Sequence, residues 1–245
     1  MKEYVREGIQ RSKGFDEKAN LSIIIVNYNG MGFSKDCLES LMASGACEEE
    51  LIIVDNASTD GSNEYIRKEF FHVRIIELDK NYGFAMANNI GAKNAKGEYL
   101  IFLNNDAVVT PNWLNPLVDT MEKDSDIGIV GSKILLLEAL GKINSAGANI
   151  TFNGCGYDIG FLDHDSEKYN VGGYRGCVCA AVMMVRREEF LNFGGFDEEY
   201  FMYLEEDVDL CWRYWLYGKK VVCVHASIIY HEFGGTSGTY RHARA

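Results

Sequence analysis

The stretch Glu98-Tyr-Leu-Ile-Phe-Leu-Asn-Asn-Asp106 decides the fold of this chain. Its first six residues form a largely apolar run that predicts a buried β-strand, and a polar turn, Asn104-Asn105-Asp106, follows directly. In an open α/β sheet, ligands bind just beyond the carboxyl ends of the strands. We therefore expect Asn105 and Asp106 to lie at a ligand-binding edge of a sheet.

Strands and helices alternate on the N-terminal side of this stretch. β-Branched and aliphatic runs predict strands over 21–26, 51–54 and 73–78, and helical spacing predicts helices over 33–43, 60–70 and 84–95. Ser58, Thr59 and Asp60 are candidate N-caps for the second helix. Repeated strand–helix units of this kind predict an α/β fold with a parallel sheet and right-handed crossovers.

The C-terminal half is less regular. Thr110-Pro111 predicts the start of a helix, and strands are expected over 127–137, 143–152, 177–185, 221–224 and 228–230. A Gly-rich loop is expected over 154–176 and a helix over 205–217. The only two prolines are Pro111 and Pro116, so no Pro-rich linker divides residues 21–245, which we expect to form one domain. Residues 1–20 show no apolar periodicity and read as an N-terminal arm without an assigned role.

Composition restricts the classes of partner. With 245 residues and a net charge of −12, the chain is a poor candidate for binding nucleic acid or an anionic lipid surface. A metal-bridged phosphate ligand remains compatible, because a divalent ion inverts the local field. The seven cysteines lack zinc-ligand spacing and indicate reduced thiols in a cytoplasmic protein. No apolar run reaches the roughly 18 residues that a membrane-spanning helix requires.

Polar residues follow the first two predicted strands as well. Asn27-Tyr28-Asn29-Gly30 is not the Gly-x-Gly-x-x-Gly turn of dinucleotide-binding folds. The amide of Asn27 and the phenol of Tyr28 suit a base or a ribose, although the same residues are good turn formers. Asp55 is expected to accept a hydrogen bond from the N3–H of a pyrimidine.

The third predicted helix opens with Asn81-Tyr-Gly83 and carries Asn88. Gly83 permits close approach of a ligand, and the N-terminus of a helix favours an anion. We therefore count Asn81, Gly83 and Asn88 as candidate ligand contacts. A purely structural helix start is the alternative for this segment.

An acidic segment over 197–209 contains seven carboxylates and no basic residue. Its interleaved aromatic and aliphatic residues indicate that part of it faces the core. Asp209 and Arg213 can pair at i,i+4, which leaves Glu206 and Asp207 to face a cleft. His231 follows a predicted strand and is a candidate ligand, whereas His225 lies between strands and serves as our comparison for a structural histidine.

Five stretches together resemble glycosyltransferase family 2, in particular its bacterial rhamnosyltransferase-like branch. They are SIIIVNYNG (22–30), LIIVDNASTDGS (51–62), NYGFAMANNIGAKNAKGEYLIFLNND (81–106), GGFDEEYFMYLEEDVDLCWR (194–213) and IIYHEFGGTSG (228–238). The resemblance implies a GT-A fold, with a nucleotide-sugar-binding half over 21–106 and an acceptor and catalytic half over 107–245.

The resemblance also implies roles for single residues. Asn27, Tyr28 and Asp55 resemble nucleoside contacts, and Asp106 resembles the metal-binding Asp. His231 matches the late histidine that completes a Mn²⁺ or Mg²⁺ site in some members. Asp207 matches the general base, with Glu206 beside it expected to help raise its pKa. The chain departs from the family pattern in lacking the first Asp of the metal motif and in having one extra residue before Asp207.

The function implied is inverting transfer of rhamnose or another hexose. The donor would be a UDP- or dTDP-sugar, and the acceptor a bacterial surface glycan or a lipid-linked saccharide. Alternatives are a galactofuranosyl- or N-acetylhexosaminyl-transferase, or a nucleotide-sugar-binding module without turnover. Location is expected in the cytoplasm or at the inner face of the membrane, with peripheral membrane association through sequence missing from this chain. Residues 234–240 are expected to act as a mobile lid over the donor phosphates.

Overall fold

The computed structural model describes residues 20–46, 49–152, 154–200 and 205–232. The N-terminal arm, apart from Asn20, and the lid expected over 234–240 lie outside the described residues. Both therefore remain predictions.

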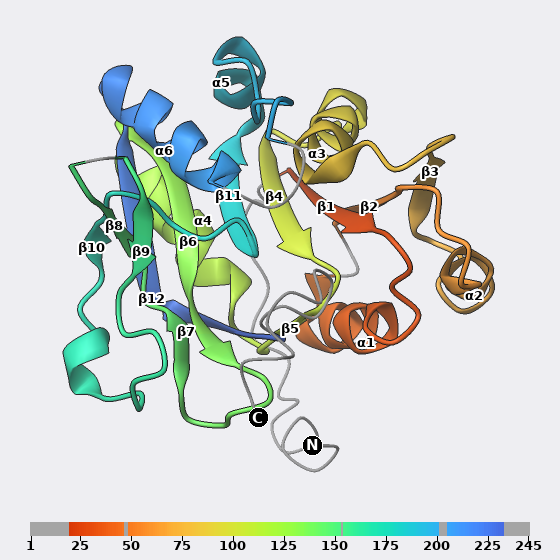
Figure 1. Ribbon diagram of the computed structural model, residues 1–245, viewed down its shortest axis with the longest axis horizontal. Helices are drawn as coiled ribbons and strands as arrows, with labels where there is room; N and C mark the ends of the chain where they lie inside the picture. The colour runs from red at the N-terminus through yellow and green to blue at the C-terminus, as the bar shows by residue number, and fades with distance from the viewer. Residues whose placement is uncertain (1–19, 47–48, 153, 201–204, 233–245) are drawn as a thin grey trace.

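A ten-stranded sheet forms the centre of the molecule (Figure 1). Its main path has the order β10-β12-β6-β11-β4-β1-β2-β3, with β5 paired to β12 and β7 paired to β6. The strands are β1 (Leu21–Asn27), β2 (Glu50–Asp55), β3 (Arg74–Glu77), β4 (Tyr99–Asn104), β5 (Ala107–Val109), β6 (Ile127–Leu136), β7 (Ile143–Ser145), β10 (Gly173–Tyr174), β11 (Val182–Arg186) and β12 (Lys220–His231). β1 to β4, β6 and β12 point in one direction, while β11 and β10 run against them. The predicted mostly parallel sheet is thus confirmed.

Helices cover both faces of this sheet. They are α1 (Ser34–Ser44), α2 (Ser62–Glu69), α3 (Gly83–Asn94), α4 (Leu114–Lys123), α5 (Arg187–Asn192) and α6 (Glu206–Leu216), with a 3₁₀ turn, η2 (Glu167–Tyr169). Successive residues of a strand point to opposite faces. Ile23 and Ile25 accordingly pack in the core under α1, α2 and α4, whereas Ile24 packs in the core under α3, α5 and α6. A continuous apolar strand is what burial on both faces requires.

Several element boundaries differ from the sequence prediction in the C-terminal half. The helix expected to open at Thr110 begins at Leu114, because the Thr110 hydroxyl donates to the carbonyl of Ile228 at 2.8 Å instead of capping a helix. The strand expected over 143–152 is divided at Gly147, which has a positive φ of 81°, into β7 and β8 (Ala148–Ile150). β8 pairs with β9 (Gly156–Asp158), which lies in the region expected to be a loop.

Three further predictions needed correction. The strand expected over 177–185 is regular only in β11, from Val182. The two late strands are one strand, β12, with a register irregularity between Val224 and Ile228. Of the candidate caps for α2, only Asp60 accepts a hydrogen bond from the first turn, from the backbone N–H of Ser62 at 3.0 Å. The bounds of β11 and β12 follow from pairing partners distant in sequence.

None of the helices in the described part of the chain combines the length and the apolar character that a membrane-spanning helix requires.

Candidate functional site

Asp106 and His231 meet at the carboxyl end of the sheet. β5 begins directly after Asp106 and runs antiparallel to β12, so that Ala107 lies opposite His231. The backbone N–H of Glu232 also donates to the Asp106 carbonyl at 3.1 Å. As a result, Asp106 Oδ1 lies 3.1 Å from His231 Nε2, and both side chains are less than a tenth exposed. The structure therefore brings together the two residues that the sequence proposed as metal ligands.

The geometry of this pair fits a small divalent cation. Neighbouring ligands of an octahedral ion with bonds of about 2.1 Å lie about 3 Å apart, close to the observed 3.1 Å between Asp106 Oδ1 and His231 Nε2. One carboxylate and one imidazole are compatible with Mn²⁺ or Mg²⁺, and they do not make the four-ligand site of structural zinc. Within the described residues, no three His, Cys, Asp or Glu side chains converge on one point.

Asp207 lies in the first turn of α6 and is tied to the same end of the sheet. Its Oδ2 accepts a hydrogen bond from the backbone N–H of Ala180 at 3.0 Å, and its Oδ1 accepts one from Val208 at 2.8 Å. The next residue, Ala181, accepts a hydrogen bond from the backbone N–H of Asn104 at 3.1 Å. The segment before β11 thus connects Asp207 to the end of β4, next to Asp106.

Burial raises the pKa of the Asp207 carboxyl to about 6, and the negative charges of Asp158 and Glu205 add to the shift. The sequence had suggested Glu206 as the neighbouring charge, but the carboxylates that contribute most lie on β9 and just before α6. Successive helix residues point about 100° apart, so Glu206, which is buried, does not share the direction of Asp207. A carboxylate with a raised pKa in a site is a candidate general base.

Asp158 is a site residue that sequence reasoning missed. It lies on β9 opposite Ala148, and its negative charge contributes to the raised pKa of Asp207. Burial raises its pKa, and a hydrogen bond with Ser145 opposes that shift. The surrounding Gly-rich sequence carried no strand signal, so only the β8–β9 pairing reveals its position.

Asn27 has a different environment from the one the sequence suggested. Its side chain is fully buried, and its Nδ2 donates to Asp55 Oδ1 at 2.9 Å and to the hydroxyls of Ser58 and Ser62. Its Oδ1 accepts hydrogen bonds from Ser34 and Asn105. Asn27 is therefore held by protein groups on several sides and ties together the loops that follow β1, β2 and β4.

The other predicted nucleotide contacts lie around the same edge. Asp55 is buried, and its Oδ2 accepts from the backbone N–H of Ser58 at 3.1 Å, while Tyr28 is half-buried. The side-chain oxygen of Asn81 accepts from the N–H of Gly83 at 2.8 Å, which shapes the start of α3. Asn88 is buried and donates to the Phe84 carbonyl one turn earlier, at 3.0 Å. The predicted contacts of these residues with a nucleotide stay predictions.

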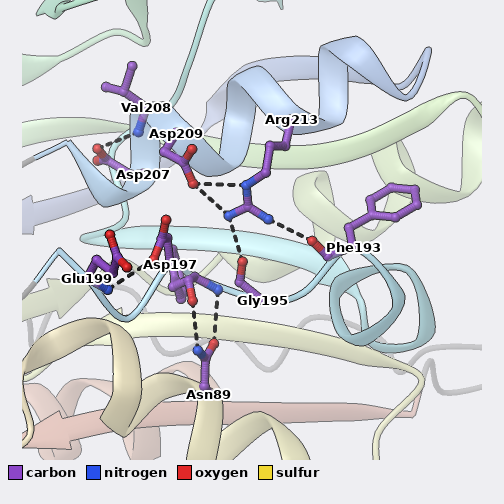
Figure 2. Close-up of polar contacts among 10 residues, drawn as sticks. Asn89, Phe193, Gly195, Asp197, Glu199, Asp207, Val208, Asp209 and Arg213 are labelled. Atoms are coloured by element: carbon purple, nitrogen blue, oxygen red, sulfur yellow. Dashed lines mark hydrogen bonds and ion pairs between the residues drawn. The ribbon is translucent and has the colours of Figure 1, made fainter.

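A clamp of two side chains fixes the turn that leads to the acidic segment (Figure 2). From α3, Asn89 donates to the Phe196 carbonyl at 2.8 Å and accepts from the Phe196 N–H at 2.9 Å. From α6, Arg213 donates to the carbonyls of Phe193 and Gly195, each at 2.7 Å, and pairs with Asp209. The expected Asp209–Arg213 pair is confirmed, and the clamp links α3 to α6.

Replacing Asn89 with Ala is expected to lower the free energy of unfolding by about 2–4 kcal/mol. The variant would leave the N–H and carbonyl of buried Phe196 without their partner, and each unsatisfied group costs about 1–3 kcal/mol. Urea denaturation measures the loss. Asn94→Ala on the same helix is the matched control, since the Asn94 side chain is exposed and we expect a smaller change. Equal denaturation midpoints for Asn89→Ala and the wild type would contradict the clamp.

The sequence matches the family model described as "Glycosyl transferase family 2" over residues 22–190. The chain belongs to glycosyltransferase family 2. A second model, the N-terminal domain of galactosyltransferase, matches residues 161–234 and so covers Asp207 and His231. The predicted family is thereby confirmed.

One relative has a similar sequence, and two solved structures have a similar fold. The O-antigen biosynthesis protein RfbC of Myxococcus xanthus is 31% identical over 223 residues, which are 86% of this glycosyltransferase chain but 17% of RfbC. A crystal structure of GalNAc-T7 with UDP, GalNAc and Mn²⁺ has a TM-score of 0.71 at 20% identity, covering 87% of this chain and 43% of that one. The mannosyltransferase PcManGT from Pyrobaculum calidifontis, with GDP-Man and Mn²⁺, has a TM-score of 0.65 at 17% identity, covering 90% and 59%. These two likenesses confirm the predicted GT-A fold.

Proposed function

We propose that this glycosyltransferase moves a hexose or deoxyhexose, such as rhamnose, from a UDP- or dTDP-sugar to a saccharide acceptor with inversion of the anomeric carbon. The acceptor would be a bacterial surface glycan or a lipid-linked precursor, as the likeness to an O-antigen biosynthesis protein suggests. The observation that carries the proposal is the convergence of a carboxylate–imidazole pair, Asp106 and His231, with a carboxylate of raised pKa, Asp207, at one end of the sheet.

Asp106 and His231 would hold Mn²⁺ or Mg²⁺ between them. When bound, the ion supplies electrostatic stabilisation to the charge that develops on the departing diphosphate. Mn²⁺ with a nucleotide or nucleotide sugar in the two similar structures supports this assignment. The protein's own contribution is to place Asp106, directly before β5, at a short separation from His231, at the end of β12.

Asp207 would accept the proton of the attacking acceptor hydroxyl. The two backbone N–H groups of Ala180 and Val208 orient its carboxylate oxygens. With a pKa of about 6, most of the carboxylate is ionised at neutral pH, yet it is more basic than an ordinary Asp. Glu206, adjacent in sequence, would support the start of α6.

The nucleoside would lie over the loops after β1, β2 and β4. In this proposal Tyr28, Asp55 and Asn105 contact the base or ribose, while Asn27 positions Asp55 and Asn105 through its amide. Asn81, Gly83 and Asn88 would shape the helix start that faces the diphosphate.

The six described cysteines are free thiols, which supports a reducing, cytoplasmic setting.

Turnover with a panel of donors tests the proposal. Purified protein is mixed with Mn²⁺ and, separately, dTDP-rhamnose, UDP-glucose, UDP-galactofuranose or UDP-N-acetylhexosamines, with and without a saccharide acceptor. We expect one donor to release nucleoside diphosphate faster when the acceptor is present, and proton NMR of the product to show the inverted anomer. Tight donor binding without release from any donor would favour a binding module. A product with a retained anomer would contradict the role of Asp207.

A further inference from the structure

Asn144 lies in a β-bulge beside the metal-ligand pair. β7 pairs antiparallel with β6, but Ile134 lies opposite Ser145 and Leu135 lies opposite Ile143. Asn144 is therefore the extra residue on β7, for which β6 offers no directly opposite partner. Bulges of this kind turn a side chain away from the regular direction of the strand, and they are enriched next to active sites.

The turned side chain reaches His231. Asn144 Oδ1 lies 2.8 Å from His231 Nδ1, and both residues are buried, Asn144 with 1% of its surface exposed. An amide oxygen only accepts hydrogen bonds, so this contact requires a proton on Nδ1. On the other side of the ring, the Asn104 amide nitrogen lies 3.3 Å from His231 Nε2. The Asn104 N–H that faces Nε2 and the Asn144 oxygen that faces Nδ1 both favour the tautomer with its proton on Nδ1.

The selected tautomer leaves Nε2 unprotonated, and Asp106 Oδ1 lies 3.1 Å from it. Metal ions bind a histidine through an unprotonated ring nitrogen, and the second ring nitrogen usually donates to an oxygen that fixes the tautomer and the ring orientation. The oxygen acceptor of Asp106 and the nitrogen acceptor of His231 lie 3.1 Å apart, a separation that suits a cation bound to both.

We infer that Asn144 is a positioning residue for the metal site. It holds the His231 imidazole in the Nδ1-protonated tautomer and sets the direction of Nε2, without itself contacting the ion. This inference rests on the proposed function, since it takes Asp106 and His231 as the metal ligands. It adds a residue from β7, in the acceptor half of the chain, that the sequence patterns around Asp106 and His231 do not indicate.

Two measurements on the metal-free protein and on its Mn²⁺ complex test the inference. First, ¹⁵N NMR of the histidine rings, assigned by comparison with His231→Ala, is expected to show a protonated Nδ1 and an unprotonated Nε2 for His231. Second, calorimetry measures Mn²⁺ binding in the presence of UDP. Asn144→Leu keeps the volume but lacks the acceptor, so we expect loss of the tautomer preference and about 10–100-fold weaker Mn²⁺ binding. Asn144→Asp retains an acceptor oxygen and should restore both.

Asn149→Leu is the matched control, because Asn149 is an exposed residue on β8, the next strand along the chain. This variant should bind Mn²⁺ with the affinity of the wild type. A protonated Nε2 in the wild type would overturn the inference, as would wild-type tautomer and affinity in Asn144→Leu. If Asn144→Leu does not fold, the wild-type and Asn144→Asp spectra decide. Undiminished Mn²⁺ binding in both Asp106→Ala and His231→Ala would instead contradict the proposed metal site itself.

Discussion

Asp207→Asn is expected to lower the turnover of sugar transfer at least about 10²-fold, the usual scale for loss of a general base. Asn is nearly isosteric with Asp but does not accept a proton at neutral pH. Asn retains one of the two oxygens that accept from the backbone N–H groups of Ala180 and Val208, so we expect the fold and donor binding to survive. Steady-state kinetics separates the effects: kcat should fall while the Kd for the donor, measured by calorimetry, stays close to that of the wild type.

The pH profile gives a second readout of the same residue. Because only the ionised carboxylate accepts a proton, kcat/KM should rise with pH through about 6, the pKa of Asp207, and level off above about 7. Stability should respond in the opposite direction. The folded state binds the Asp207 proton more tightly than the unfolded state, so the free energy of unfolding should fall as pH rises from about 4 to about 6. Asp207→Asn should remove this component of the pH dependence.

Control variants show whether the assignment of the acidic segment is correct. Asp36→Asn changes an exposed carboxylate on α1 and should leave turnover unchanged. Near-normal turnover in Asp207→Asn, combined with an inactive Glu206→Gln or Glu205→Gln, would mean that Glu206 or Glu205 is the general base instead of Asp207. Activity in all three variants would require a base elsewhere, and Asp158 would then be the next carboxylate to test.

Asp106→Ala is expected to abolish metal-dependent binding of the nucleoside diphosphate, with a loss of affinity for UDP in the presence of Mn²⁺ of at least about 10²-fold. His231→Ala should act in the same direction, because the two donor atoms are 3.1 Å apart and would share one ion. A ligand at 100 times its Kd stabilises a protein by about 2.7 kcal/mol. The stabilisation that UDP and Mn²⁺ give to the wild type together should therefore disappear in both variants.

His225→Ala is the matched control for the histidine. His225 lies on the same strand as His231 but six residues earlier, which is about 20 Å along an extended chain. The control should bind UDP and Mn²⁺ like the wild type. Unchanged affinity and an unchanged metal requirement in Asp106→Ala would lead us to abandon Asp106 as a metal ligand, whatever the effect of His231→Ala.

The sequence alone predicted the strand–helix alternation over residues 21–106. β1, β2 and β4 are largely apolar strands, and each ends at a polar residue: Asn27, Asp55 and Asn104. Burial on both faces of a parallel sheet imposes this pattern locally, so each strand and its ligand-facing end can be read without knowledge of the rest of the chain. Family motifs then related Asp106, Asp207 and His231 to one reaction.

The tertiary structure decided how these residues meet and which others join them. The pairing of β5 with β12 places His231 against Asp106, and the β8–β9 hairpin adds Asp158. A bulge on β7 turns Asn144 toward His231, and Asn89 holds the backbone of Phe196 across 107 residues of sequence. These contacts depend on strand register and backbone hydrogen bonds between distant segments. Such bonds involve atoms that every residue possesses, so they leave no mark in the pattern of side chains along the chain.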